Sequence, residues 1–195
     1  MKRLILQMQM SLDGFMAGDD PSLGWTVWNW DETCRWDEAL KQRFNETFTG
    51  IDTVLLSGPM ANDYIRHWTR MYEQRVGDPD FAFTERIVAA HKRVISKSVA
   101  PIQQPRTSIG RGLLPVEVAA LKQGSGGDII CFGGVRFAAA LLENDLVDEL
   151  QLYVNPSVIV VGRSIFKEAR RMRCIDAASY DCGIVVQRYV PSSRW

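Results

Sequence analysis

The segment Asp128-Ile129-Ile130-Cys131-Phe132-Gly133-Gly134-Val135-Arg136-Phe137 decides which fold we expect for this chain of 195 residues. The apolar run Ile129 to Phe132 predicts a buried strand, and Val135 to Leu142 predicts a helix. A glycine pair between a strand and a helix lets backbone N–H groups and the positive helix end approach a phosphate, because no side chain blocks the way. The segment therefore predicts that the chain binds a nucleotide-like cofactor.

Strand and helix patterns alternate through the first two thirds of the chain, and strands alone follow. Short apolar or alternating runs predict strands, and a spacing of four, as in Trp36, Leu40, Phe44 and Phe48, predicts a helix. The expected strands are 4–10, 52–56, 93–96, 129–132, 147–154, 158–161, 172–178 and 184–189. The expected helices are 33–48 (N-cap Asp31), 59–68, 81–91, 116–122 and 135–142. Residues 69–80 are expected to form a loop. Alternation implies parallel crossovers, and the last strands imply antiparallel pairing. We expect one mixed-sheet α/β domain over residues 1–195.

The composition argues against several classes of protein. The 23 basic and 23 acidic residues give a net charge of zero, which disfavours a protein that mainly binds nucleic acid or an anionic membrane. No apolar stretch approaches the length of a membrane span. The first residues are basic and apolar, but Gln7 and Gln9 interrupt them before a signal-peptide core forms. We expect a cytoplasmic protein with a small-molecule substrate.

The cysteines and histidines do not predict a metal site. Cys34, Cys131, Cys174 and Cys182 form no CxxC pair, and the two histidines lie far apart in the sequence without paired spacing. We expect free thiols in a reducing compartment and no bound metal.

Three loops that follow expected strands carry groups suited to phosphate. They are Ser57-Gly58-Pro59, Ser96-Lys97-Ser98 and Gly133-Gly134. Ligands of an open α/β sheet gather at the carboxyl ends of the strands, so the three loops together indicate one extended cofactor groove. For any single loop, the alternative is that glycine only ends a strand. The fingerprint GxGxxG is absent from the sequence, which disfavours an ordinary Rossmann dehydrogenase.

Two further features point to the substrate end of such a groove. Asp13-Gly14 follows the first strand, so its carboxylate could orient a heterocycle or relay a proton, although this dipeptide is also a common turn. Tryptophans gather at positions 25, 28, 30 and 36. Aromatic faces stack on flat ligands but also fill interfaces, so this segment is expected to line a pocket or a dimer contact.

Together these residues resemble the dihydrofolate-reductase-like superfamily, and within it the RibD C-terminal family, the reductase domain of the bifunctional riboflavin-biosynthesis deaminase-reductase. The resemblance extends over nearly the whole chain. Its motifs, in order, are Ser11-Leu12-Asp13-Gly14, Asp52-Thr53-Val54-Leu55-Leu56 with Gly58, Val94-Ile95-Ser96-Lys97-Ser98, Gly127-Asp128-Ile129 up to Gly133-Gly134, Leu146-Val147-Asp148-Glu149-Leu150, and Asn155-Pro156 with Gly162 and Phe166.

The resemblance implies a dihydrofolate-reductase-like three-layer α/β fold, with a mixed, mostly parallel central sheet and antiparallel C-terminal strands. It implies NADPH as hydride donor and a flat heterocyclic substrate, as in the 5-amino-6-(5-phosphoribosylamino)uracil reductase and dihydrofolate reductase families. Members commonly form homodimers through strands that correspond to residues 147–161 here. The residues implied by the resemblance are Gly133, Gly134 and Val135 at the pyrophosphate, Ser96 and Lys97 near the adenosine phosphate, Gly58 in the same groove, and Asp13 facing the nicotinamide and substrate.

Three features depart from the family pattern. The loop after the second strand usually reads Gly-Arg-x-Thr and here reads Gly58-Pro59-Met60-Ala61, which removes a guanidinium and a hydroxyl that could bind phosphate. Riboflavin-pathway members tend to carry Lys after Asp-Gly, where this chain has Phe15, so a cation for a substrate phosphate is missing. The deaminase signature, HxE followed by PCxxC, does not occur.

These observations leave three hypotheses. The leading one is an NADPH-dependent reductase of a small, flat, conjugated substrate, with Asp13 acting on the substrate and Trp25 or Trp28 lining the pocket. The second is a cofactor- or ligand-binding homodimer without efficient catalysis, suggested by Pro59 and Ala61. The third is reduction of dihydrofolate itself. The substrate stays open, because specificity depends on loop geometry that no motif determines.

Overall fold

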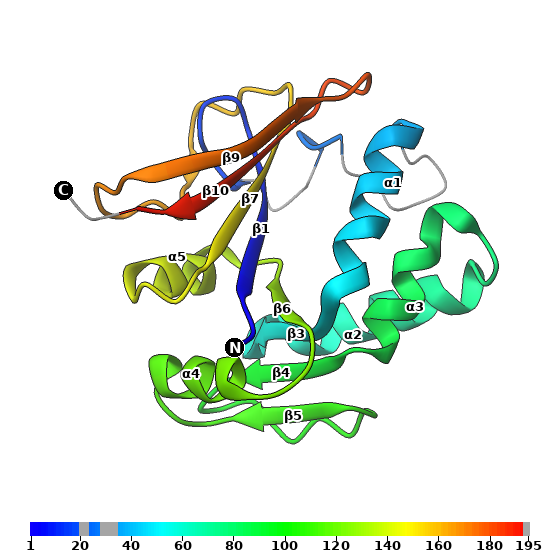
Figure 1. The fold of residues 1–195 in the computed structure, drawn as a ribbon, viewed down its shortest axis with the longest axis vertical. Coiled ribbons are helices and arrows are strands. Elements are labelled where there is room, and N and C mark those ends of the chain that lie inside the picture. The colour runs from blue at the N-terminus through cyan, green and yellow to red at the C-terminus, as the bar shows by residue number, and fades with distance from the viewer. Residues whose placement is uncertain (20–23, 28–34, 193–195) are drawn as a thin grey trace.

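The structure, a computed structural model, describes residues 1–19, 24–27 and 35–192. Within this part of the chain, eight strands form one sheet in the order β5-β4-β3-β6-β1-β7-β10-β9 (Figure 1). Its strands are β1 (Leu4–Met10), β3 (Ile51–Ser57), β4 (His91–Ile95), β5 (Thr107–Gly110), β6 (Asp128–Cys131), β7 (Glu149–Val154), β9 (Met172–Ser179) and β10 (Val185–Pro191). A separate pair joins β2 (Ala17–Gly18) to β8 (Gly162–Arg163).

The strand directions confirm the mixed sheet expected from the sequence. Strands β5, β4, β3, β6, β1 and β7 run parallel, each beside the next. The last two strands, β10 and β9, are antiparallel to their neighbours. Strand β5 was not expected, because its four residues Thr-Ser-Ile-Gly carry no clear alternation of apolar and polar side chains.

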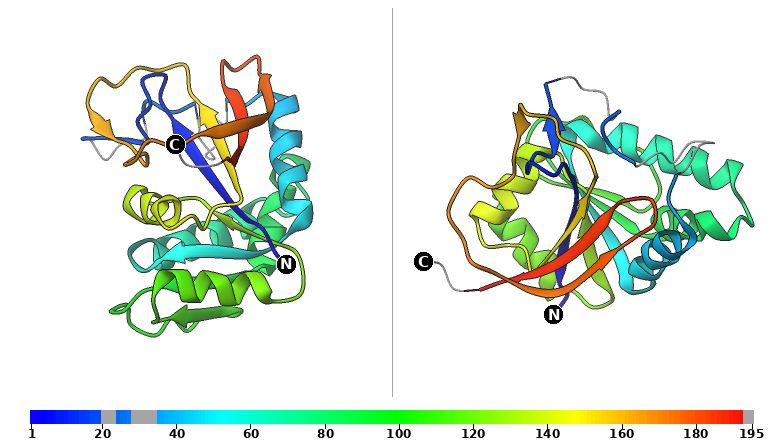
Figure 2. Two further views of the ribbon diagram at one scale, coloured as in Figure 1. Left: turned by 60° about the vertical axis from the view of Figure 1, so that its left-hand side comes forward. Right: turned by 90° about the horizontal axis from the view of Figure 1, so that it is seen from above.

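Helices cover both faces of the sheet and make three layers (Figure 2). They are α1 (Glu38–Thr47), α2 (Gly58–Gln74), α3 (Ala82–Ala89), α4 (Leu114–Gln123) and α5 (Val135–Glu143), with short 3-10 turns at Phe48–Gly50 and Pro79–Phe81. The first three pack in one apolar cluster and the last two in another, on opposite sides of the strands. Among the described helices, none is both long and apolar enough to cross a membrane.

Helix α1 begins later than expected. Asp37 is its N-cap, because the carboxylate accepts a hydrogen bond from the backbone N–H of Leu40 at 3.0 Å. Residues 35–37 are not helical, so the expected start at Thr33 is wrong, and Thr33 and the expected cap Asp31 lie outside the described residues. The apolar stripe was correctly identified, since Trp36, Leu40, Phe44 and Phe48 are all buried.

Other helix ends also differ from the prediction. Helix α2 continues through Gln74 instead of stopping near Trp68, because Met71 extends its buried face by one more turn. Part of the expected loop at 69–80 is therefore helical. At the other end of α3, His91 belongs to strand β4 and not to the helix.

The expected strand at 158–161 does not form. The carboxylate of Asp13 accepts hydrogen bonds from the backbone N–H groups of Ile159 and Val160, at 3.2 and 2.7 Å, and Val160 has a φ of 65°. These N–H groups therefore cannot pair with a neighbouring strand, and the left-handed backbone at Val160 interrupts an extended chain.

The sheet leaves only some strands accessible to a second copy of the chain. Strand β7 is hydrogen-bonded to β1 on one side and to β10 on the other. Within the described residues, the edges of the large sheet are β5 and β9. The homodimer remains a prediction, and a sheet contact through the C-terminal strands would have to use β9 instead of β7.

Truncating Phe44 should test the aromatic core beneath α1. Its ring is fully buried and lies 4.8 Å from the ring of Phe83, 5.2 Å from Phe48 and 5.3 Å from Trp36. We expect Phe44→Ala to lower the free energy of unfolding by about 3–5 kcal/mol through the cavity it leaves. Phe44→Leu keeps much of the apolar volume and should cost about 1–2 kcal/mol. Urea denaturation measures both, and equal losses would contradict the cavity explanation.

Candidate cofactor-binding site

Two helix N-termini converge at the carboxyl ends of the central strands. Helix α2 begins at Gly58 directly after β3, and α5 begins at Val135 after β6, with Gly134 as its N-cap. Since β3 and β6 are adjacent and parallel, these ends lie together. The backbone N–H of Gly134 donates to the sulfur of Met60 in α2 at 2.7 Å, which joins the two helices directly. Both ends carry the positive potential that favours an anion.

Gly58 permits a close approach between α2 and the loop after β4. A Cβ atom at Gly58 would lie 2.5 Å from Oγ of Ser96 and 2.6 Å from its Cβ. The Ser96 hydroxyl in turn accepts hydrogen bonds from the N–H groups of Val99, at 3.1 Å, and Ser98, at 3.4 Å. Gly58 and Ser96, expected to share one groove, are therefore in contact.

Gly133 occupies the middle of the same region. It has a φ of +110°, which favours glycine, and its peptide bond to Gly134 is cis. A Cβ built on Gly133 would meet the side chain of Met8 from β1 at 3.2 Å. The neighbouring Cys131 is fully buried, and this burial raises the pKa of its thiol to about 12, so it is no nucleophile. Gly133 thus brings bare backbone close to the central strand.

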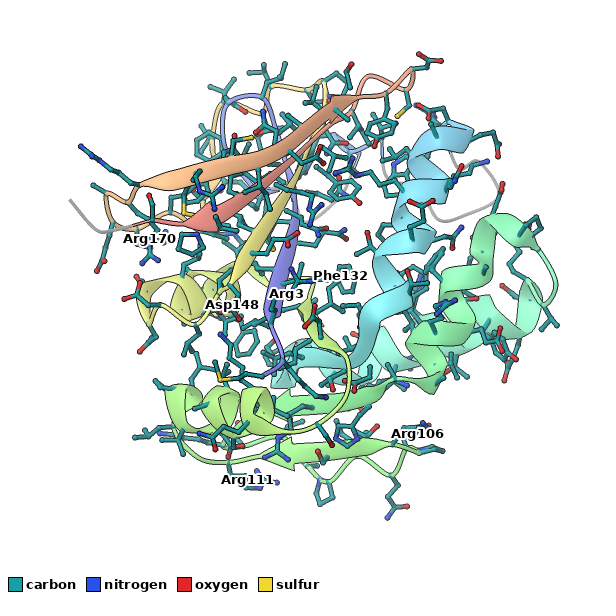
Figure 3. All side chains as sticks on the ribbon, in the orientation of Figure 1. Arg3, Arg106, Arg111, Phe132, Asp148 and Arg170 are labelled. Carbon is teal, nitrogen blue, oxygen red and sulfur yellow. The ribbon has the colours of Figure 1, made fainter. Side chains whose placement is uncertain are left out.

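Lys97 is exposed in the loop after β4, and the side chain of Arg111 binds this loop. The Arg111 guanidinium donates to the carbonyl oxygens of Lys97 and Val99, both at 2.9 Å. Figure 3 shows Arg111 beside β5 and α4. Arg111 could not be predicted from the sequence, because no motif marks a cation that binds backbone carbonyls twelve and fourteen residues away. Its role here is to hold the loop in place.

Asp13 has a structural role: its carboxylate joins two loops by hydrogen bonds. Its carboxylate accepts a hydrogen bond from the Ser11 hydroxyl at 2.5 Å as well as those from Ile159 and Val160. The Ser11 hydrogen bond and these N–H groups lower the pKa of Asp13 below its usual value. The residue therefore joins the loop after β1 to the segment after β7, and its expected catalytic role stays a prediction.

Residues 24–27, a described part of the tryptophan-rich segment, are joined to the sheet through Val27 and Asn155, a residue predicted from the sequence only as part of a motif. Asn155 is fully buried, accepts from the Val27 N–H at 2.7 Å and donates to Oε1 of Gln9 at 2.8 Å. Trp25 lies half-buried in this segment, and its indole N–H is enclosed without a hydrogen-bond acceptor among the described residues. The other expected substrate contact, Trp28, lies outside the described residues.

The described residues contain no cluster of three or more His, Cys, Asp or Glu side chains that could hold a metal ion. The groups assembled at the carboxyl ends of β3, β4 and β6 are glycines, hydroxyls and helix N-termini. This set suits a phosphate-bearing organic cofactor.

The contact of Gly58 with Ser96 predicts a coupled pair of substitutions. Gly58→Ala should destabilise the protein by about 1–3 kcal/mol, because the new methyl group collides with Ser96. Gly50→Ala is the matched control, since a Cβ there meets nothing within 4 Å. Ser96→Gly added to Gly58→Ala should recover most of the loss. A double-mutant cycle by thermal unfolding measures the coupling, and simple additivity would contradict the contact.

The substitution Asp13→Asn tests whether Asp13 has the structural role of joining the two loops. The pKa of Asp13 in the folded protein is lowered below the ordinary value of about 3.9. The stabilisation from its hydrogen bonds is therefore present at neutral pH and is lost as the pH falls through the folded pKa. The substitution should then speed amide hydrogen exchange at Ile159 and Val160. Unchanged exchange at both amides would contradict this structural role of Asp13.

Comparison with known proteins agrees with this architecture. Residues 2–186 match the RibD C-terminal domain family. The chain is 27% identical over 192 residues to the "uncharacterized protein YyaP" of Bacillus subtilis (strain 168), covering 94% of this chain and 92% of that protein.

Solved structures share the fold at low sequence identity. A diaminohydroxyphosphoribosylaminopyrimidine deaminase/5-amino-6-(5-phosphoribosylamino)uracil reductase from Thermotoga maritima matches with a TM-score of 0.66 and 15% identity, over 98% of this chain and 57% of that one. A pyrimidine reductase-like protein from Corynebacterium diphtheriae matches with a TM-score of 0.62 and 13% identity, over 98% and 92%. The sheet, the glycine turns and the matched span together place this chain in the RibD C-terminal domain family.

Proposed function

We propose that this protein is an NADPH-dependent reductase that transfers hydride to a small, flat heterocyclic substrate. Family membership supports a reductase-like fold, and the Thermotoga maritima relative is described as a uracil-derivative reductase. The observation that carries the proposal is the meeting of two helix N-termini, at Gly58 and at Gly134, beyond the carboxyl ends of the adjacent parallel strands β3 and β6.

The residues present fit a phosphate-bearing dinucleotide. The N-terminal ends of α2 and α5 would face the pyrophosphate, with the Gly134 N–H as a donor. Ser96 and Lys97 would serve the adenosine phosphate with a hydroxyl and a cation. When bound, NADPH supplies the hydride, and the protein contributes orientation, electrostatics and exclusion of water.

The substrate would bind beside Trp25 and the carboxamides of Gln9 and Asn155. These carboxamides lie at the carboxyl ends of β1 and β7 and are joined to one another and to Val27 by hydrogen bonds. An aromatic wall next to amide groups suits a flat ring that carries both donors and acceptors. Asp13 would act from the neighbouring loop.

One observation favours the second candidate, a ligand-binding protein without efficient catalysis. Met60 blocks the Gly134 N–H in this structure, and the side chain that follows it, Ala61, is fully buried and cannot reach a phosphate. Because a thioether is a weak acceptor, an incoming phosphate oxygen would displace it at modest cost. The leading proposal therefore requires Met60 to move aside.

Gly134→Ala tests the proposed cofactor site. The φ of Gly134 is negative, at −43°, and the new methyl group would lie 3.3 Å from the sulfur at the flexible end of Met60, so we expect the fold to persist. The methyl group would obstruct the pyrophosphate. We expect NADPH to raise the melting temperature of the native protein, and Gly134→Ala to weaken NADPH affinity at least tenfold by calorimetric titration.

Gly50→Ala is again the control and should bind NADPH like the native protein. Absence of any rise in melting temperature at millimolar NADPH would overturn the proposal. NADPH binding without NADPH oxidation, across aminopyrimidinediones, pteridines and dihydrofolate, would favour the non-catalytic alternative.

A further inference from the structure

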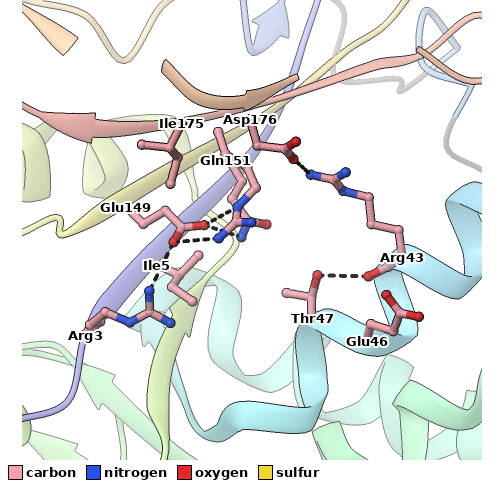
Figure 4. A pocket seen from close by; sticks show the side chains of 10 residues that line it. Arg3, Ile5, Arg43, Glu46, Thr47, Glu149, Gln151, Ile175 and Asp176 are labelled. Atoms are coloured by element: carbon pink, nitrogen blue, oxygen red, sulfur yellow. Dashed lines mark hydrogen bonds and ion pairs between the residues drawn. The ribbon is translucent and has the colours of Figure 1, made fainter. Parts of the chain in front are cut away.

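A polar cavity of about 540 Å³ lies between α1 and the antiparallel strands β9 and β10 (Figure 4). It is lined by Arg3, Ile5, Arg43, Glu46, Thr47, Glu149, Gln151, Ile175, Asp176 and Arg188. Arg3 and Glu149 lie at the amino ends of β1 and β7, whereas Gly58 and Gly134 lie beyond the carboxyl ends of β3 and β6. The cavity is therefore separate from the proposed cofactor site.

We propose that this cavity binds a small molecule through an oxyanion, either a carboxylate or a phosphate group, held by the guanidinium groups of Arg43, Arg188 and Arg3. The three arginines come from α1, from β10 and from the residue before β1. None of the residues expected from the sequence to bind cofactor or substrate lines this space.

The sheet face behind the cavity carries buried polar side chains beside apolar ones, whereas the face toward α5 is apolar throughout. The side chains of β1 and β7 that face α5 are Leu4, Leu6, Met8, Leu150, Leu152 and Val154. On the opposite face, Gln7, Glu149 and Gln151 are 2%, 1% and 5% exposed. Burial of such groups costs free energy, and buried ion pairs are often no more stabilising than apolar packing. Ligand recognition gives this face a role that stability does not.

The buried acid of the cavity has no capacity left for another donor. One oxygen of Glu149 accepts from Gln151 at 2.8 Å and from Nε of Arg188 at 2.7 Å. The other accepts from Nη2 of Arg188 at 3.0 Å and from Arg3 at 3.3 Å. Burial alone would raise the pKa of Glu149, but these hydrogen bonds and the charge of both arginines hold it below its usual value. Glu149 therefore positions the arginines and stays ionised.

The three arginines have more N–H donors than their protein contacts use. Each guanidinium has five N–H groups in a planar fork. Arg188 gives two hydrogen bonds to Glu149. Arg3 gives one to Glu149 and two, from Nε and Nη2, to Asp128. Arg43 pairs with the partly exposed Asp176 on the strand edge and contacts Tyr180. Among the described residues, these contacts use only part of the N–H groups of the three guanidiniums. Carboxylate and phosphate oxygens match this fork geometry best.

The remaining walls suit the body of a small molecule. Ile5 and Ile175 offer apolar contact, and Thr47 and Gln151 offer polar groups. The volume falls within the range of about 300–1,000 Å³ typical of small-molecule sites. The carboxylates of Glu46, Glu149 and Asp176 balance the charge of the three arginines, so we expect a small anion that contacts the guanidinium forks directly and not a polyanion.

Arg43 is the position to change. Removing Arg188 would leave the buried Glu149 without its main partner and would destabilise the fold, whereas Asp176, the partner of Arg43, is partly exposed. The probes are inorganic phosphate and malonate, with sodium chloride at matched ionic strength, measured by thermal shift and calorimetric titration. We expect phosphate, malonate or both to raise the melting temperature above the chloride control, and Arg43→Gln to weaken that binding at least tenfold.

Arg66→Gln is the matched control, because it removes the same charge from an exposed arginine of α2 that pairs with Asp63 on its own helix. It should keep native anion affinity, and Arg43→Lys should show an intermediate loss because it keeps charge without the fork. Phosphate binding alone would identify a phosphate ester as the ligand class, and malonate binding alone a carboxylic acid; both outcomes support the site.

Anion binding that Arg43→Gln leaves intact, or a response no larger than that to chloride, would overturn the proposal. Gly134→Ala should keep native anion affinity, which excludes the helix N-termini of the cofactor site as the origin of the signal. Failure of NADPH binding would leave these measurements unaffected.

Discussion

Strand β1 lies between β6 and β7 and is parallel to both, so its register determines which residues of those strands stand side by side. Leu6 lies opposite Cys131 on one side and Leu150 on the other. Two residues further along, Met8 reaches Gly133, and at the end of the strand Met10 pairs with Val154, just before Asn155. A shift of one residue would exchange the two faces of β1 and place leucines under α1. The positions of the glycine turn and of Val27, which is hydrogen-bonded to Asn155, both depend on this pairing.

The two faces of β1 and β7 have different tasks. The face toward α5 is uniformly apolar and provides burial, the main favourable contribution to folding. The face toward α1 is mixed, with an aromatic cluster around Phe44 and Tyr153 beside a ladder of glutamines and Glu149. Because the aromatic cluster already anchors α1, the polar ladder is not needed to hold that helix. It is the arrangement expected where a cavity, rather than close packing, is retained.

Much of the fold could be predicted because its signals are local. The buried stripe from Trp36 to Phe48, the strand at 4–10 and the strand-glycine-helix turn at 128–142 each follow from spacing along the chain. The errors arise where a distant partner decides the outcome. Residues 158–161 have strand-like composition, yet Asp13 takes their N–H groups. Asp37 and Asp31 are equally good caps by composition, and tertiary packing places the helix start at Asp37.

The residues of the two proposed sites also differ in how far the sequence predicts them. Gly58, Ser96 and Gly134 follow strands of one parallel sheet, so topology alone brings them together. The cavity beside α1 could not be predicted, because Arg3, Arg43 and Arg188 are widely spaced in sequence and none belongs to a motif. In the sequence these arginines look like ordinary surface residues. Only the strand register shows that Glu149 lies between Arg3 and Arg188.

The contact between Met60 and Gly134 connects the unusual sequence Pro59-Met60-Ala61 to the chemistry of the proposed cofactor site. A backbone N–H at a helix start that is enclosed without an acceptor costs free energy, so some group must satisfy it when no ligand is bound. A thioether does this weakly, whereas a hydroxyl or carboxylate would compete more strongly with a phosphate oxygen. With Pro59 and Ala61 after Gly58, contacts to a pyrophosphate at the proposed site would have to come from the backbone and the helix ends. A weak and flexible acceptor at Gly134 preserves that source of affinity, and this is compatible with cofactor binding through the glycine turn.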